Sequence, residues 1–150
     1  MPRVSATGFF PVLITDRLTE CRDFYVRHFG FDVVFELDWY IQLMSEKRIQ
    51  LGLLKPGHTS QPEFLHRGYE GHGVVYSFEV DDVDRGYEKL KSDGVEIIFD
   101  VRTEPWGQRH FMIMDPGSMV VDVVQLVEPA VEFKQSYVGS SAAKATNSLD

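Results

Sequence analysis

An internal repeat constrains the fold of this chain more than any other feature of its sequence. Residues 12–16 (VLITD) can be overlaid on residues 78–82 (FEVDD), and a helical pattern follows each of them. After each helical pattern comes a glycine-led segment, GFDV in the first copy and GVEI in the second. A repeat of this kind indicates two copies of one supersecondary unit. We therefore expect two half-sheets of the same design within the 150 residues.

Two helices are predicted, one in each copy. Apolar residues recur at helical spacing over residues 19–29, where Asp16 or Thr19 can cap the helix and Gly30 can end it. In the second copy, a helix over residues 83–92 follows two capping aspartates and is ended by a glycine. The order of elements in each copy is therefore βαβββ.

Eight strands complete the two copies. The predicted strands cover residues 9–15, 31–36, 39–44, 48–54, 74–80 and 95–101 and the two arms of a hairpin between residues 107 and 125. The repeats span about residues 8–54 and 74–127, and a long loop over residues 55–73 joins them. We predict one domain over residues 1–136 and a flexible tail over residues 137–150, which are small and polar.

The open faces of the half-sheets determine the predicted architecture. Four strands covered on one face by a single helix leave the other face uncovered. The predicted fold is therefore α+β, with two βαβββ repeats forming a curved mixed sheet around a cleft and with the helices on the outer face. Such a cleft is the default place for a small ligand.

The hairpin at residues 107–125 carries the clearest sign of a binding site. Residues 115–118 (Asp-Pro-Gly-Ser) predict a tight turn, with Gly117 at the position that other residues avoid. Asp122 interrupts the apolar run of the second arm. Because an uncompensated buried charge is costly, this carboxylate must face a cavity or a partner. A ligand is one candidate, and a salt bridge with Arg109 or Arg102 is the alternative.

Composition and charge exclude several classes of partner. The net charge of −8 and the absence of a basic stripe argue against nucleic acid and anionic membranes. Cys21 is the only cysteine, so an intrachain disulfide and a cysteine-rich metal site are ruled out. No signal-peptide pattern is present, and no apolar run approaches the roughly 18 residues needed to span a bilayer. We therefore expect a cytoplasmic protein.

Three sequence blocks together resemble a known superfamily. Their residues are Asp16, Phe24, Tyr25, Phe29, Gly30 and Phe31; Val80 to Asp84, Leu90 and Asp93 to Val95; and Arg109, Phe111, Asp115 to Gly117 and Asp122. Over about residues 8–127 the chain resembles the vicinal oxygen chelate superfamily, which includes glyoxalase I, bleomycin-resistance proteins and extradiol dioxygenases. The resemblance implies the fold, whereas the superfamily hosts both enzymes and binding proteins.

The resemblance also identifies the positions of a possible metal site. In metal-dependent members, one His, Gln or Glu on each of four strands holds a divalent ion. The corresponding positions here are Phe9, Gln50, Val75 and Asp122. Two of the four have no lone pair, and one amide plus one carboxylate are too few ligands for Mg²⁺, Mn²⁺, Zn²⁺ or Fe²⁺. We therefore predict no metal and no cofactor, as in the antibiotic-binding branch.

Strand alternation predicts which side chains face the cleft. They are Phe9, Pro11 and Leu13 on the first strand, Val75, Ser77 and Glu79 on the fifth, His110, Met112 and Met114 on the seventh, and Val120, Asp122 and Val124 on the eighth. A slip of one residue would reverse any of these assignments. His110, as a lone histidine in an apolar strand, is either a ligand contact or a structural residue.

Two tryptophans stand at the ends of predicted elements. Trp39 and Trp106 could border the mouth of a cleft, where each indole stacking on a planar ligand contributes on the order of 1 kcal/mol. The alternative is that each indole packs at the end of the sheet. The candidate ligand-binding residues are Phe9, Trp39, Gln50, Val75, Trp106, Arg109, His110, Met112 and Asp122. No catalytic residue is predicted.

The resemblance and the missing metal ligands together favour a binding protein. We expect a homodimer that sequesters a small aromatic compound, plausibly an antibiotic, and so confers resistance. An acidic cleft around Asp122 would suit a cationic ligand. The alternative is a glyoxalase- or dioxygenase-like enzyme acting on a small metabolite.

Overall fold

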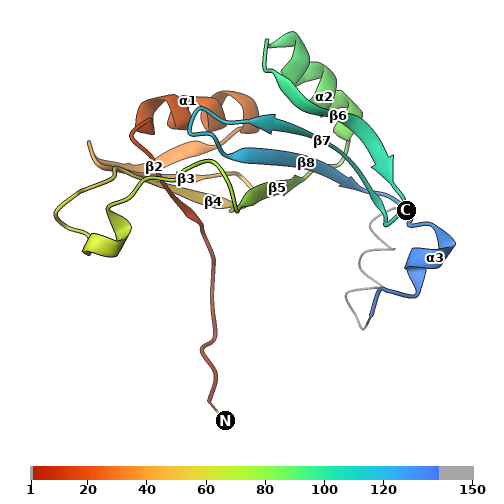
Figure 1. Ribbon diagram of the computed structural model, residues 1–150, viewed down its shortest axis with the longest axis horizontal. Coiled ribbons are helices and arrows are strands. Elements are labelled where there is room, and N and C mark those ends of the chain that lie inside the picture. The colour runs from red at the N-terminus through yellow and green to blue at the C-terminus, as the bar shows by residue number, and fades with distance from the viewer. Residues whose placement is uncertain (1, 139–150) are drawn as a thin grey trace. The chain divides into compact units, whose positions relative to one another are not determined.

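A computed structural model describes residues 2–138, which divide into two compact units. Within these residues, unit 1 consists of residues 2–71 and 115–118, and unit 2 of residues 72–114 and 119–138. Each unit has one four-stranded mixed sheet with a helix on one face (Figure 1). The predicted α+β class and the two βαβββ repeats are therefore confirmed.

Unit 1 contains the first repeat. Its elements are β1 (Val12–Ile14), α1 (Leu18–Phe29), β2 (Asp32–Glu36), β3 (Tyr40–Met44), β4 (Gln50–Leu54) and the short 3₁₀ helix η1 (Glu63–Leu65). The strand order is β1-β4-β3-β2, with β1 parallel to β4 and the other pairs antiparallel. A parallel β1 requires a crossover, and α1 with β2 and β3 supplies it.

Helix α1 covers the sheet of unit 1 through one apolar stripe. Leu18, Cys21 and Tyr25 are buried at helical spacing, and Gly30 ends the helix in the left-handed conformation at φ 68°. Burying each such side chain stabilises the unit by about 1.5–3 kcal/mol. The N-cap is Arg17, without a side-chain cap bond, so neither predicted capping residue occupies the cap position.

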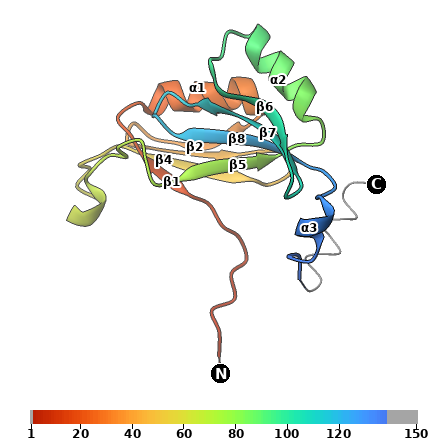
Figure 2. The same ribbon diagram turned by 45° about the vertical axis from the view of Figure 1, so that its right-hand side comes forward.

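Unit 2 contains the second repeat. Its elements are β5 (Val75–Glu79), α2 (Val83–Ser92), β6 (Ile97–Glu104), β7 (Gln108–Met114), β8 (Val120–Leu126) and α3 (Val131–Lys134). The order β5-β8-β7-β6 repeats that of unit 1, again with a parallel pair, β5 and β8. Figure 2 shows α2 on one face of this sheet.

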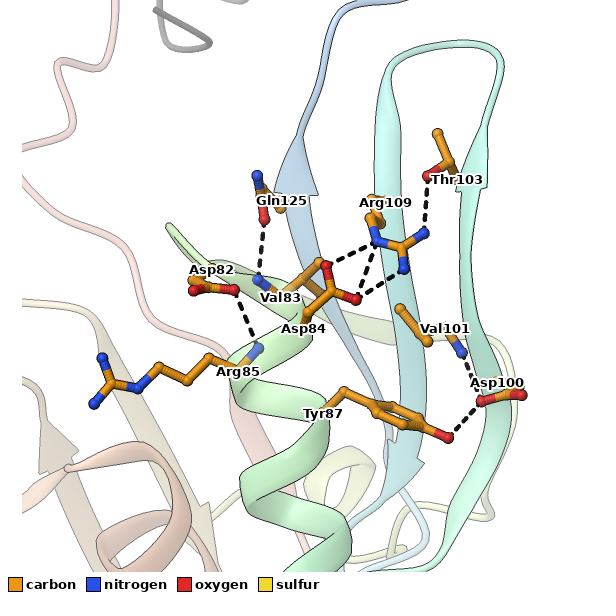
Figure 3. A network of polar contacts seen from close by, with 10 residues as sticks. All are labelled: Asp82, Val83, Asp84, Arg85, Tyr87, Asp100, Val101, Thr103, Arg109 and Gln125. Atoms are coloured by element: carbon orange, nitrogen blue, oxygen red, sulfur yellow. Dashed lines mark hydrogen bonds and ion pairs between the residues drawn. The ribbon is translucent and has the colours of Figure 1, made fainter.

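Polar contacts fix α2 on its sheet, as Figure 3 shows. Asp82 caps the helix, because its carboxylate accepts from the backbone N–H of Arg85 at 3.1 Å. Arg109 of β7 donates to Asp84 of α2 at 2.8 Å and to Thr103 of β6 at 3.0 Å. The guanidinium therefore joins the helix to two strands, on the helix side of the sheet.

Three local predictions need correction. Leu13 does not face the open side of its sheet: it is 3% exposed and packs on the helix side. The reason is that the strand begins at Val12 and the helix cap falls one residue later than expected. In the turn at residues 115–118, Ser118 rather than Gly117 takes the positive φ.

Gly117 is small for a different reason. A Cβ there would lie 3.1 Å from Cys21 Sγ and 3.1 Å from a methyl carbon of Leu13. The third correction concerns the strand expected over residues 95–101, which extends to Glu104. The small side chain at position 117 thus reflects packing between segments far apart in the sequence, whereas Glu104 continues its strand by pairing with Gln108 of β7.

Other expectations stay predictions. These are the single domain over residues 1–136 and the cleft formed by both repeats. The predicted tail begins at Tyr137, which is described, but residues 139–150 lie outside the described part of the chain. Among residues 2–138, no helix has the length and apolarity to cross a membrane.

Candidate functional site

The sheet of unit 2 has one face under α2 and one face that we call the open face. Phe111 and Ile113 of β7 and Val121 and Val123 of β8 are buried on the helix side. Strand pairing places alternate residues of all four strands on the opposite side. The open face is formed by Val75, Ser77, Glu79, Phe99, Arg102, Glu104, Gln108, His110, Met112, Met114, Val120, Asp122, Val124 and Leu126.

Three ionisable side chains are buried together on the open face. His110 Nδ1 lies 2.8 Å from Asp122 Oδ1, and His110 Nε2 lies 3.0 Å from Glu104 Oε2. The three residues are 4%, 7% and 8% exposed, respectively. They come from the middle of β7, the middle of β8 and the end of β6. The expectation that Asp122 needs a partner is thus met by a histidine rather than by an arginine.

The geometry of the cluster favours a doubly protonated His110. Both carboxylates can only accept hydrogen bonds when ionised, so both ring nitrogens of His110 must donate. Burial by itself lowers the pKa of His110, but the hydrogen bonds and charges of Glu104 and Asp122 outweigh it, and the net effect raises the pKa. The hydrogen bond from His110 lowers the pKa of Glu104. The arrangement therefore favours an imidazolium between two carboxylates.

A fourth charge completes this cluster. Arg102 donates from Nε and Nη2 to the two oxygens of Glu104, each at 3.1 Å. Its guanidinium carbon lies over the ring of Phe99, 4.4 Å from the ring centre. We call Arg102, Glu104, His110 and Asp122 the ionic cluster; its two cations balance its two carboxylates.

Sequence reasoning placed several residues on this face correctly. His110, Met112 and Asp122 lie together, because Met112 pairs with Asp122 across β7 and β8. Val75 lies on the same face at the edge strand β5, where it is half exposed. Whether these residues contact a ligand stays a prediction.

Arg109 lies on the opposite side of the sheet from the ionic cluster. It is adjacent to His110 in β7, so its side chain points the other way, towards α2 (Figure 3). There its guanidinium is paired with Asp84, which raises the pKa of Arg109. The structure therefore does not bring Arg109 together with Asp122.

Trp106 lies in the β6–β7 turn, two residues after Glu104. Its indole Nε1 donates to Gln108 Oε1 at 2.9 Å, and its ring meets the edge of Phe133 at 6.5 Å between ring centres. The Tyr137 hydroxyl donates to the carbonyl oxygen of Trp106. The indole is 41% exposed, so the C-terminal segment holds the residue in place and leaves part of the ring uncovered.

The remaining candidates lie in unit 1. Trp39 stacks on His58, with ring centres 4.0 Å apart and ring planes 9° apart. Gln50 accepts from Gln42 at 2.9 Å on the face opposite α1. Phe9 precedes β1 and is 84% exposed.

Equivalent positions in the two repeats follow from strand pairing. Gln42 pairs with Gly52 in unit 1 as Met112 pairs with Asp122 in unit 2. Val12 pairs with Gly52 five residues before the helix cap, and Ser77 pairs with Asp122 five residues before its cap. Gly52, rather than Gln50, is therefore the counterpart of Asp122.

Counting residues from the helix caps also locates the four positions that hold a metal ion in metal-dependent members of the superfamily. Val75 lies seven residues before the cap of α2, and Phe10 rather than Phe9 lies seven before the cap of α1. The four positions are thus occupied by Phe10, Gly52, Val75 and Asp122, of which only Asp122 has a donor side chain. A divalent ion needs at least three protein donors at such a site, so these residues do not fit one.

The neighbours of Asp122 do not supply the missing donors. His110 has no free lone pair while both nitrogens donate to carboxylates. Within residues 2–138, no group of three or more His, Cys, Asp or Glu side chains is arranged to hold a metal ion. The charged groups of the ionic cluster are therefore paired with one another.

A polar cavity of about 390 Å³ lies within unit 1, beside the N-terminus of α1. Thr15, Arg17, Tyr69 and Ser118 contribute to its lining. Its cation is already paired, because Arg17 donates to Glu20 at 2.5 Å. The cavity therefore presents no group that points to a particular ligand.

Sequence reasoning missed Phe99 and Glu104 and treated Arg102 only as a possible partner of Asp122. Irregular pairing between β6 and β7 interrupts the simple alternation that would have assigned them to the open face. The available signal was charge: Arg102 and Glu104 are two residues apart in an extended segment, which places both on one side of a strand.

Comparison with known proteins agrees with this fold. The sequence profile of the Glyoxalase/Bleomycin resistance protein/Dioxygenase superfamily matches residues 9–123. No curated protein matches the chain. A glyoxalase/bleomycin resistance protein/dioxygenase from Nocardioides has a similar structure, with a TM-score of 0.69, 20% identity and coverage of 84% of this chain and 87% of that one.

Two further solved structures have different stated activities. Lactoylglutathione lyase from Agrobacterium tumefaciens has a TM-score of 0.66 and 22% identity, over 81% of this chain and 95% of that chain. TnmS3, an antibiotic binding protein from Streptomyces sp. CB03234, has a TM-score of 0.63 and 24% identity, over 84% and 99%. At these identities the likeness concerns the fold. The profile match covers most of the sequence, and the chain therefore belongs to the Glyoxalase/Bleomycin resistance protein/Dioxygenase superfamily.

Proposed function

We propose that this protein binds a small aromatic molecule without a metal ion, and that the open face of unit 2 contacts it. The observation that carries the proposal is the state of Asp122. It is the only donor side chain among the four equivalent positions, and His110 already neutralises it. Such a pair can form part of a polar binding surface. It does not provide the set of donor side chains that a metal-dependent reaction would need.

The composition of the open face supports an aromatic ligand. Apolar and polarisable side chains, among them Phe99, Met112 and Val75, surround the ionic cluster. Sites for small molecules combine such surfaces with a few fixed polar groups. Trp106, in the turn that follows β6, offers a partly exposed indole for stacking.

The relatives support a binding role without deciding it. TnmS3 is described as an antibiotic binding protein, whereas another structure of this fold is a lyase. The missing donors favour the first kind. We propose that the ligand is sequestered rather than converted, that the protein acts in the cytoplasm as a homodimer, and that resistance to an aromatic antibiotic is its role.

The test combines metal analysis with ligand titration. We expect gently purified protein to contain no stoichiometric divalent metal and to melt at the same temperature with and without a chelator. A panel of planar antibiotics should then change the tryptophan fluorescence in a saturable way. Stoichiometric metal whose removal lowers the melting temperature would overturn the proposal and favour a glyoxalase- or dioxygenase-like enzyme.

A further inference from the structure

We propose that Arg102, seated on Phe99, selects the ligand, and that this ligand is a planar aromatic molecule with an acidic group such as a carboxylate. The inference rests on the proposed function, since it assumes that the open face binds an aromatic compound. It replaces the earlier expectation of a cationic ligand, which followed from Asp122 alone.

The first argument concerns which charge a ligand meets. Within the ionic cluster, the side chains of His110, Glu104 and Asp122 are 6%, 9% and 10% exposed, whereas that of Arg102 is 58% exposed. The two carboxylates are covered and paired with the imidazolium between them. A molecule approaching the cluster therefore meets a guanidinium, although the cluster as a whole is neutral.

The second argument concerns how Arg102 is held. Phe99 lies against one side of the guanidinium, and Glu104 binds it along one edge through Nε and Nη2. Its third nitrogen, Nη1, has no hydrogen-bond partner among residues 2–138. The group is thus preorganised, and the side away from Phe99 and one nitrogen are available to a ligand.

Guanidinium chemistry defines the ligand class. A planar guanidinium stacks on aromatic rings and donates to carboxylates with a geometry that an ammonium group does not reproduce. A flat aromatic acid can use both properties, with its ring over the guanidinium and its carboxylate at Nη1. The side chain of Met112, which pairs with Phe99 across β6 and β7, extends the apolar surface beside that ring.

One exposed carboxylate on the same face does not reverse this preference. Glu79 lies on β5, and β5 and β6 are the two opposite edges of the sheet. With adjacent strands about 4.8 Å apart, Glu79 is roughly 14 Å from the Arg102 strand. At physiological ionic strength this exceeds the distance of about 8 Å over which exposed charges interact strongly.

The experiment compares three probes that share one ring system. Naphthalene-2-carboxylate, naphthalene-2-carboxamide and naphthalen-2-ylmethylammonium are titrated by calorimetry at pH 7 into the wild type and into the Arg102→Gln and Arg102→Lys variants. Arg67→Gln is the matched control, because Arg67 is an exposed, ion-paired arginine of unit 1. Melting curves of all variants confirm that they are folded.

The inference predicts a clear order of affinities. The carboxylate should bind wild type about tenfold or more tightly than the ammonium, since a charge-assisted hydrogen bond is worth roughly that factor. Arg102→Gln should remove the preference, Arg102→Lys should retain part of it, and Arg67→Gln should leave it unchanged.

Four results would overturn the inference. A preference for the ammonium probe, or a carboxylate preference that survives Arg102→Gln, would show that Arg102 does not select the ligand. Equal binding of all three probes would also remove the selection while leaving an aromatic-binding face in place. Failure of every probe to bind would overturn the proposed function together with the inference.

Discussion

The two repeats have the same strand pairing and the same crossover. They differ in one diagonal pair of side chains on neighbouring strands, on the face opposite the helix; we call this pair the diagonal. In unit 2 that diagonal joins His110 to Asp122 as a buried ion pair. In unit 1 the same positions are Tyr40 and Gly52, and the Tyr40 hydroxyl oxygen lies 2.5 Å from the point where a Cβ of Gly52 would be. Both copies thus have the same strand pairing and crossover, but the diagonal is charged in unit 2 and uncharged in unit 1.

This difference shows that the fold and the ionic cluster have different sequence requirements. Both sheets bury alternate apolar residues under their helices, which requires only the right pattern. The ionic cluster requires a histidine, two carboxylates and an arginine in register. Unit 1 has no such residues at the corresponding positions of β3 and β4, where Tyr40, Gln42 and Gly52 are uncharged.

The largest expected effect is from removing the centre of the ionic cluster. His110→Ala leaves Asp122 buried without its cation and leaves Glu104 with Arg102 alone, and we expect a loss of about 3 kcal/mol in the free energy of unfolding. Urea denaturation at pH 7 measures it. The matched control is Arg109→Gln on the helix side, where loss of a more exposed ion pair should cost no more than about 1 kcal/mol.

Equal losses for these two variants would contradict the comparison. They would mean that the open face is no more dependent on its charges than the helix side is. A loss with His110→Ala that the further change Asp122→Asn partly restores would strengthen it, because that variant removes the uncompensated carboxylate.

The next effect concerns the neutral diagonal of unit 1. Gly52→Ala places a methyl group against the Tyr40 hydroxyl and a Val12 methyl, and we expect a loss of about 1–2 kcal/mol from overpacking. Tyr40→Phe removes the hydroxyl, so the same change should cost less in that background. A double-mutant cycle by urea denaturation checks this. Additive losses would show that Tyr40 does not fill the space above Gly52.

A smaller effect is the dependence of stability on pH. The pKa of His110 is raised above its ordinary value of 6.5 in the folded state, so its contribution is full below pH 6.5 and is lost as pH rises through the folded pKa. The pKa of Glu104 is lowered from 4.5, so its contribution is full above pH 4.5 and is lost as pH falls through the folded pKa.

The ionic cluster should therefore stabilise unit 2 most between pH 4.5 and 6.5. Denaturation of wild type and His110→Gln at pH 5.5, 7 and 8.5 checks this, because the difference between the two proteins should shrink as pH rises. A difference that stays constant over this range would contradict the protonated state of His110.

The smallest expected effect is on ligand affinity at the edge of the open face. Trp106→Ala should weaken binding of a planar ligand severalfold, on the order of 1 kcal/mol. Trp39→Ala in unit 1 is the comparison, since that indole already stacks on His58. Calorimetric titration of naphthalene-2-carboxylate measures both. An unchanged affinity in Trp106→Ala would assign this indole to packing against Phe133.

The helices, their caps and the strand alternation could largely be predicted from the sequence, because each depends on a local sequence pattern. The helix at Val83–Ser92 and its cap Asp82 match the expected bounds, and Gly30 ends α1 as expected. Alternation along the hairpin also placed His110 and Asp122 on one face. These features depend on the spacing of residues within one segment, which can be read directly from the sequence.

The partners of Asp122 could not be predicted in the same way. Glu104 lies beyond residue 101, where the strand was expected to end, and the irregular pairing of β6 with β7 brings it next to His110. Leu13 was assigned to the wrong face because one residue separates the expected cap Asp16 from the actual cap at Arg17. In both cases the register between strands, rather than the pattern within one, decides the contact.

The central claim is that a doubly protonated His110 neutralises the carboxylates of the open face. The most direct test is the ¹⁵N NMR spectrum of the histidine side chains at pH 7, with the His110 signals assigned by their absence in His110→Gln. The account predicts that both ring nitrogens of His110 carry protons and that Zn²⁺ leaves their signals unchanged. An unprotonated ring nitrogen at pH 7, or a shift of these signals on adding Zn²⁺, would contradict it.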